Sequence, residues 1–144
     1  IGHEYSKLND GLSAVSYVDK AIEIVKEGNE EYNSAIYMRL LDKYYILNRL
    51  KRYDEAIALL NNIEENSDKI TGNTRLFKRS LYTAKGWKAM FNQDSESALE
   101  YGNIALEYAD HDWEKEDVYY MFYKAYKAQN KMKKAEKYKK MANL

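Results

Sequence analysis

Apolar side chains recur at three- and four-residue spacing along most of the chain, which is typical of amphipathic helices. Val15, Val18 and Ile22 form one such stripe within a predicted helix over residues 12–26. No stretch alternates apolar and polar residues for long enough to be a strand. The pattern therefore predicts an all-α protein.

Eight helical segments are predicted, separated by polar turns rich in Gly, Asn, Asp and Ser. The segment over 30–50 is apolar over more than half of its circumference, so we expect it to contact neighbours on two sides. Taken in pairs, the segments form four helical hairpins, the first of them truncated. The predicted helices span residues 1–9, 12–26, 30–50, 54–65, 74–91, 96–109, 113–128 and 132–143.

One frame repeats along the chain: a helix end, a short polar turn, and an alanine that opens the next helix. The alanines are Ala14, Ala56, Ala98 and Ala135, at spacings of 42, 42 and 37 residues. The same frame aligns Gly2, Tyr44, Gly86 and Tyr123 twelve residues earlier, and Ala21, Ile63, Ala105 and Ala142 seven residues later. Most of these positions are small enough for close helix contact, although Tyr44 and Tyr123 are bulky. The repetition predicts a stack of hairpins in which each unit covers its neighbour's apolar face.

This frame resembles the tetratricopeptide repeat (TPR) family, and the resemblance covers essentially the whole chain. The family places a small residue in the first helix, a tyrosine three residues later and two alanines in the second helix. The matching residues are Gly2-His3-Glu4-Tyr5 with Ala14, Val18 and Ala21; Tyr53-Asp54-Glu55-Ala56; and Tyr123-Lys124-Ala125-Tyr126 with Ala135 and Ala142. The chain departs from the family in its longer units, which exceed the usual length of about 34 residues by 8, 8 and 3. It also lacks the usual terminal proline, because it contains no proline.

The resemblance implies a right-handed superhelix, an α-α solenoid, whose first helices line a concave groove. The residues expected to face a partner there are Leu41, Tyr45, Asn48, Arg49, Thr83, Trp87, Met90, Tyr120, Lys124 and Lys127, with His3 and Lys7 from the truncated first unit. One subset of the family grips a partner's terminal carboxylate with paired Lys and Asn. Tyr45 stands where that subset carries asparagine, so the clamp is not expected here.

Trp87 and Tyr45 are the best candidates for a binding platform, since large aromatics with a polar edge are common interface anchors. The alternative is that both rings belong to the core between hairpins, because aromatic residues at helical spacing often do.

The lysine-rich last segment has two interpretations. Residues 124–140 contain eight lysines and a single glutamate. They could form a basic patch for an acidic partner or phosphate, and the interleaved Tyr126 and Tyr138 would suit nucleic acid. Arginine, the usual reader of phosphate, is however absent there. A solvated helix that closes the stack explains the same lysines, and we favour that interpretation.

Composition restricts the remaining function classes. The 144 residues are enough for a single domain over 1–144, with 45% hydrophobic and 32% charged residues and a formal net charge of zero. This balance gives no case for nucleic acid or an anionic membrane. No apolar run approaches the roughly 20 residues that span a bilayer. The chain starts at Ile1 within a helical pattern, so we expect a preceding segment, and both cytoplasmic and periplasmic locations stay open.

No catalytic or cofactor motif is present in the sequence. Asp110-His111-Asp112-Trp113-Glu114 looks like a metal cluster, but adjacent side chains in a turn diverge. We favour acidic residues at a helix N-terminus instead. The carboxylates are expected on exposed helix faces, with ordinary pKa values. We therefore expect neither an enzyme nor a metal or other cofactor.

Two function hypotheses follow. The first is a protein-interaction module that binds a peptide or protein segment in the groove. The second is a sensory or regulatory repeat domain of a larger sensor kinase or transcription regulator. It rests on a further resemblance, because longer repeat units of this type resemble helical-repeat regions of bacterial signalling proteins.

Overall fold

A computed structural model describes residues 15–24, 26 and 32–144 of the chain, and these residues are all-α, as predicted. The chain divides into two compact units, unit 1 over residues 1–74 and unit 2 over residues 75–144. Each unit is described by itself. Ala14, His3 and Lys7 lie outside the described residues, and the expectation of a single domain stays a prediction.

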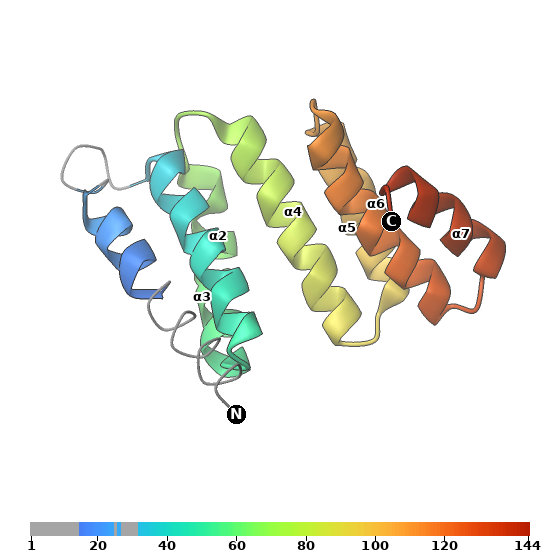
Figure 1. The fold of residues 1–144 in the computed structure, drawn as a ribbon. Helices are drawn as coiled ribbons and strands as arrows, with labels where there is room; N and C mark the ends of the chain where they lie inside the picture. Colours follow the sequence, from blue (N-terminus) through green and yellow to red (C-terminus); the bar gives the residue numbers. More distant parts are fainter. Residues whose placement is uncertain (1–14, 25, 27–31) are drawn as a thin grey trace. The chain divides into compact units, whose positions relative to one another are not determined.

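Unit 1 contains a helical stretch over residues 15–24, then α2 (Ser34–Arg49), α3 (Tyr53–Asn66) and the short 3-10 helix η1 (Ser67–Lys69). The helices α2 and α3 form an antiparallel hairpin (Figure 1). Their apolar stripes meet in a core that includes Ile36, Leu41, Tyr44, Leu60 and Ile63, each at most 2% exposed. Tyr44 therefore fills the core at a position where Gly86 stands in the next repeat.

The predicted start of α2 at residue 30 was too early. Residues 32 and 33 instead pair with the connection after η1: Ser34 N donates to Thr71 O at 2.7 Å, and Thr71 N donates to Tyr32 O at 2.9 Å. Asn33 then caps the helix, since its Oδ1 accepts from Ala35 N at 2.8 Å. A backbone committed to this pairing cannot also be helical.

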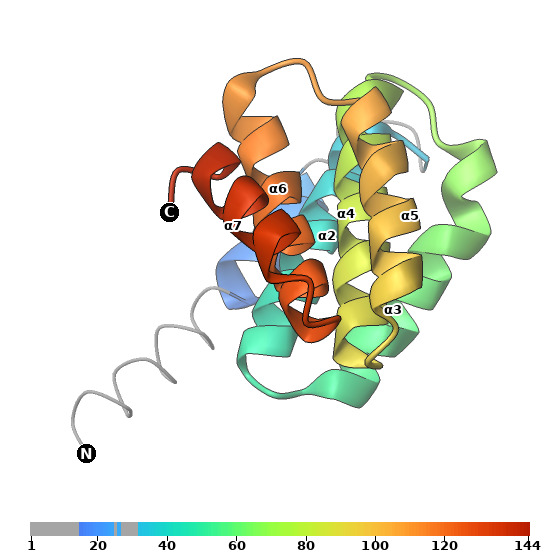
Figure 2. The ribbon, with the colours of Figure 1, turned by 90° about the vertical axis from the view of Figure 1, so that its right-hand side faces the viewer.

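Unit 2 contains two hairpins, built from α4 (Thr74–Phe91), α5 (Ser95–Glu107), α6 (Asp112–Ala128) and α7 (Met132–Met141). These bounds lie within two residues of the predicted ones. Helix α6 packs against both α5 and α7, and it lies between the α4–α5 hairpin and α7 (Figures 1 and 2). The first helices of the two hairpins, α4 and α6, are neighbours.

The same turn closes each of the three described hairpins. Lys51, Gln93 and Asn130 have φ values of 61°, 60° and 58°, in the left-handed region. In the first turn Lys51 N donates to Asn48 O at 3.0 Å and Arg52 N donates to Leu47 O at 2.9 Å, and the other two turns repeat these bonds. Each left-handed residue stands five positions before a fully buried alanine: Ala56, Ala98 and Ala135. The repeat read from the sequence is therefore present as a repeated hairpin turn.

Two glycines of unit 2 allow α6 to approach its neighbours closely. A Cβ atom on Gly86 of α4 would lie 2.5 Å from Met121 Sδ, and one on Gly102 of α5 would lie 2.3 Å from Phe122 Cε1. Met121 and Phe122 are buried on α6. The core of unit 2 therefore depends on α6 fitting into the space that α4 and α5 leave free.

Candidate binding surface

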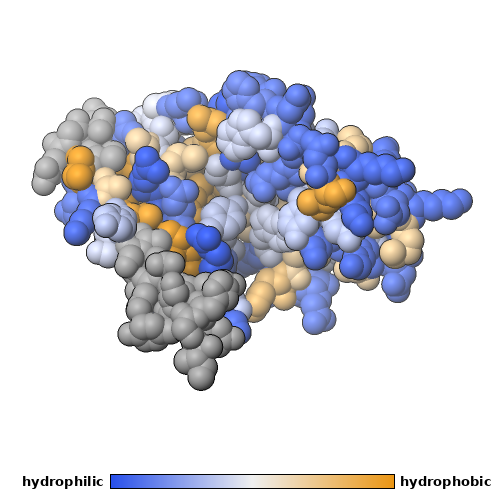
Figure 3. All heavy atoms as spheres, viewed as in Figure 1, coloured by the Kyte–Doolittle hydropathy of each residue, from blue (hydrophilic) through white to orange (hydrophobic). Residues whose placement is uncertain are grey.

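Three aromatic side chains on α4 and α6 form a continuous row. The rings of Trp87 and Tyr120 are 5.6 Å apart, and those of Tyr120 and Tyr123 are 6.4 Å apart. All three side chains are half-buried. The view of Figures 1 and 3 looks onto α4 and α6, and side chains of intermediate hydropathy gather there among strongly hydrophilic ones. The row thus offers apolar ring surface that solvent still reaches.

Lysines surround the end of this row at Tyr123. Lys124, Lys127 and Lys139 place their Nζ atoms 5.9, 5.7 and 6.0 Å from the centre of the Tyr123 ring. Lys124 Nζ is also 5.7 Å from the Tyr120 ring. Such cation–π contacts hold flexible ammonium groups near the ring. We call this surface the Tyr123 face, defined by Trp87, Tyr120, Tyr123, Lys124, Lys127 and Lys139.

The other predicted groove residues of unit 2 lie around or beneath this face. Met90 is half-buried and, like Trp87, packs against the core cluster of Ala105, Val118, Met121 and Phe122. Thr83 is 1% exposed, and its hydroxyl donates to Arg79 O at 2.8 Å. A bound segment would therefore not reach Thr83 in this structure.

The predicted groove residues of unit 1 occupy α2. Leu41 is 1% exposed and belongs to the core, so a partner would not reach it either. Tyr45 and Asn48 are half-buried, and Arg49 is exposed. The Tyr45 ring makes an edge contact with Tyr44, with their centres 5.3 Å apart. That these residues share one groove with unit 2 stays a prediction.

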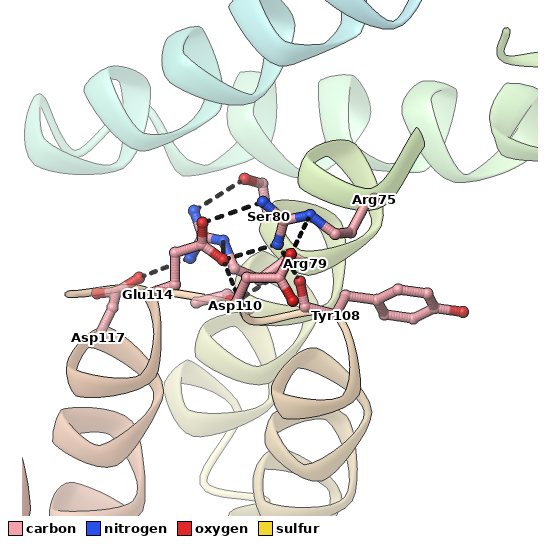
Figure 4. A network of polar contacts seen from close by, with 8 residues as sticks. Arg75, Arg79, Ser80, Tyr108, Asp110, Glu114 and Asp117 are labelled. Atoms are coloured by element: carbon pink, nitrogen blue, oxygen red, sulfur yellow. Dashed lines mark hydrogen bonds and ion pairs between the residues drawn. The ribbon is translucent and has the colours of Figure 1, made fainter. Parts of the chain in front are cut away.

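An ionic network holds one end of unit 2 together, where α4 and α6 begin and α5 ends (Figure 4). Arg75 donates from Nη1 and Nη2 to the two carboxylate oxygens of Glu114, at 2.9 and 3.2 Å. Arg75 also donates to the Tyr108 carbonyl at the end of α5 and pairs with Asp110 at 3.2 Å. Asp110 N donates to Glu114 Oε2 at 3.0 Å. The network fixes α6, and with it Tyr120 and Tyr123, against α4.

Glu114 corrects the expectation that the carboxylates sit on exposed faces with ordinary pKa values. Its side chain is 0% exposed. The hydrogen bonds from Arg75 lower the pKa of Glu114 from 4.5 to about 2, against the opposing effect of burial, and the bond from Asp110 N adds to the lowering. Glu114 is therefore an ionised, fully paired internal carboxylate.

Arg79 is a second buried cation beside this network. It is 7% exposed, and its guanidinium lies 5.2 Å from the centre of the Trp113 ring. Its Nη2 donates to Ser80 Oγ at 3.3 Å, and its Nη1 is 3.5 Å from Asp117 Oδ2. Its Nε is 3.9 Å from Glu114 Oε2, and neither Nε nor Nη1 has a hydrogen-bond partner among the described residues, so Glu114 and Asp117 compensate the charge of Arg79 without satisfying all of its donors.

Residues 110–114 match the favoured interpretation, acidic residues at a helix N-terminus, only in part. They do surround a helix N-terminus, but His111, the residue before α6, makes no side-chain cap. Asp110 and Glu114 join the network with Arg75 instead. Among residues 15–24, 26 and 32–144, no group of three or more His, Asp or Glu side chains is arranged to hold a metal ion.

Sequence reasoning missed two members of the Tyr123 face, Tyr123 and Lys139. Tyr123 and Tyr44 are the two bulky residues at a repeat position where the other two copies have glycine. Tyr44 is buried there and Tyr123 is half-buried, so the sequence pattern does not distinguish a core ring from a surface ring at this position. Lys139 lies on a different helix, so only the structure brings it to Tyr123.

The chain matches no family model, no curated protein and no solved structure. Within the described part of the chain, none of the helices has the length and apolar character that crossing a bilayer requires. The arrangement of side chains therefore carries the functional assignment by itself.

Proposed function

We propose that the protein is a non-enzymatic interaction module that binds a peptide or protein segment on the Tyr123 face. The observation that carries this proposal is the Trp87–Tyr120 pair, two large rings in contact at 5.6 Å and both half-buried. Rigid aromatic side chains with a polar edge are enriched at the energetic centres of interfaces. They lose little conformational entropy on binding, since neighbouring rings already hold them.

The proposal includes a TPR-like stacking of the hairpins. Its support is the repeated left-handed turn at Lys51, Gln93 and Asn130, each followed five residues later by a fully buried alanine. In unit 2 the first helix of one hairpin lies beside the first helix of the next, which is how such stacks create a continuous binding surface.

The expected affinity follows from the apolar area available. An aromatic side chain buries roughly 150–250 Å² in a good interface. At about 25 cal/mol per Å², two partly exposed rings supply several kcal/mol before the entropy cost of association. Micromolar binding therefore needs no cofactor, and the rings should account for much of it.

Peptides selected from an unbiased display library on the full chain provide the test. Trp87→Ala combined with Tyr120→Ala should weaken their binding by about 30-fold or more, as expected for interface anchors worth about 2 kcal/mol. Tyr45→Ala, alone and with Trp87→Ala, measures whether unit 1 contributes. The matched control is Trp113→Ala, since Trp113 is 59% exposed at the beginning of α6, and it should change the affinity less than threefold.

Binding is measured by fluorescence anisotropy, and circular dichroism checks that helicity is retained. If no peptide is selected, or if the Trp87 and Tyr120 substitutions leave the affinity unchanged in a folded protein, the proposed function is wrong.

A further inference from the structure

Charge is unevenly distributed along the chain. Residues 75–144 contain fourteen Lys and Arg against ten Asp and Glu, whereas residues 1–74 contain nine against thirteen. Within unit 2, nine of the ten acidic residues lie between residues 94 and 117. The last part of α6 and all of α7 therefore form a strongly basic region, and its positive potential is concentrated rather than spread over the unit.

Part of this positive charge is gathered around one aromatic ring. Three of the eight lysines in residues 124–140 surround the single ring of Tyr123. Lys124 and Lys127 belong to α6 and only Lys139 belongs to α7, so a solvated helix that closes the stack does not by itself account for this cluster. Three like charges around one ring repel each other, so the arrangement carries an electrostatic cost that an anionic partner would remove.

No carboxylate in the described part of the chain forms an ion pair with Lys124, Lys127 or Lys139. The described acidic side chains that do pair with lysine or arginine lie elsewhere, for example Asp42, Asp110 and Glu114. The three ammonium groups are therefore available to negative charges supplied from outside the chain.

Resting on the proposed function, we infer that the segment bound on the Tyr123 face is acidic, with glutamate or aspartate side chains flanking an apolar or aromatic one. The carboxylates contact Lys124, Lys127 and Lys139, and the apolar side chain packs on Trp87 and Tyr120. The face thus has the two parts that such a segment needs, in contact through the Tyr120–Tyr123 pair at 6.4 Å.

Carboxylates fit this face better than phosphate. Arginine, whose planar fork matches phosphate, is absent from residues 118–144. Three separate lysines are point charges on flexible stems, which suit several single charges distributed along an extended segment. The charge complementarity should also raise the association rate and make it sensitive to salt.

The probe is a fluorescein-labelled peptide in which glutamates flank one phenylalanine, compared with its analogue carrying glutamine in place of glutamate. The full chain should bind the acidic peptide at least about tenfold more tightly at low salt. Replacing Lys124, Lys127 and Lys139 together by glutamine should remove that preference. The matched control replaces Lys131, Lys133 and Lys140, three exposed lysines with the same total charge and no ring contact in the described structure, and should retain most of it.

An equal loss in both triple variants would overturn the inference, because it would show attraction by net charge alone. Tighter binding of a single-stranded oligonucleotide, a phosphopeptide, an anionic vesicle or a second copy of the chain at the same lysines would also overturn it. The library selection separates the two proposals. Selected peptides that depend on Trp87 and Tyr120 but are neutral or basic would refute the acidic partner while leaving the interaction module standing.

Discussion

Arg75 donates two hydrogen bonds, at 2.9 and 3.2 Å, to the carboxylate of Glu114, which lies 39 residues further along the chain. The pair joins the first turn of α4 to the first turn of α6. The Glu114 side chain is 0% exposed, so its end of the pair is shielded from water. The two parallel hydrogen bonds also restrict the relative orientation of the guanidinium and the carboxylate. The same two helices carry Trp87 and Tyr120.

Glu114→Gln should destabilise the protein by about 3 kcal/mol, because Arg75 and the buried Arg79 lose their shared carboxylate, and Asp110, whose side chain is 65% exposed, compensates Arg75 only in part. Urea denaturation at neutral pH, followed by circular dichroism, measures the loss as a lower midpoint with an unchanged slope. Asp42→Asn is the control, because its pair with Arg39 joins two side chains that are 48% and 54% exposed and is worth less than about 1 kcal/mol. Equal effects of the two substitutions would contradict the central role of Glu114.

The same carboxylate predicts a pH dependence. The pKa of Glu114 is lowered to about 2 in the folded chain, from an ordinary value of 4.5. An ionised carboxylate with a lowered pKa stabilises the fold fully at pH values above its pKa in the unfolded chain. This stabilisation is lost as the pH falls toward its pKa in the folded chain. The difference in unfolding free energy between the native chain and Glu114→Gln should therefore be constant above about pH 5 and shrink between pH 4.5 and 2. A difference that does not change over this range would show that the charge of Glu114 is not what stabilises the fold.

Most of the fold could be predicted from the sequence because helices depend on local periodicity. The helix α4 begins and ends at the predicted residues, since Asn92, Gln93 and Asp94 form a recognisable turn after it. The start of α2 was misplaced because its competitor, the backbone pairing with Thr71, comes from a distant part of the chain. Local patterns contain no information about such a partner.

Part of the candidate site was expected from the resemblance to a repeat family. The resemblance named Trp87, Tyr120, Lys124 and Lys127 as groove residues, and ring and cation–π contacts connect them through Tyr120 and Tyr123. Glu114 was expected only as an acidic residue at a helix N-terminus, and its burial was not expected, although it stands four residues before the buried Val118 on the apolar stripe of α6. A charged residue on an apolar stripe indicates a buried partner, but the sequence does not say that the partner is Arg75.

The hairpin turns offer a stabilising substitution. Gln93 has a φ of 60°, which strains any residue with a Cβ atom and suits glycine. Gln93→Gly should therefore raise the unfolding free energy by about 0.5–1 kcal/mol, despite the greater freedom of glycine in the unfolded chain. Asn92→Gly is the control, because Asn92 lies outside the left-handed region, and it should destabilise or have no effect. A gain for both, measured by thermal unfolding, would mean that the left-handed backbone is not the cause.

An added Cβ atom would meet a rigid side chain at Gly102 and a flexible one at Gly86, in the same core. A Cβ on Gly102 would lie 2.3 Å from Phe122 Cε1, part of a rigid ring that is 3% exposed and held among other buried side chains. A Cβ on Gly86 would lie 2.5 Å from Met121 Sδ, and a methionine side chain has several rotatable bonds with which to move away. In both helices, alanine is otherwise favoured over glycine by about 1 kcal/mol.

We therefore expect Gly102→Ala to destabilise the protein by about 2 kcal/mol, because overpacking at the ring exceeds the gain in helix propensity. Gly86→Ala should cost less than about 1 kcal/mol, since the Met121 side chain can yield. Denaturant unfolding of the two variants measures the difference directly. Adding Phe122→Leu should recover part of the loss in Gly102→Ala, relative to Phe122→Leu alone, because the obstructing ring is gone. An equal cost at both glycines, or no such recovery, would show that α6 does not fit against α5 as the structure has it.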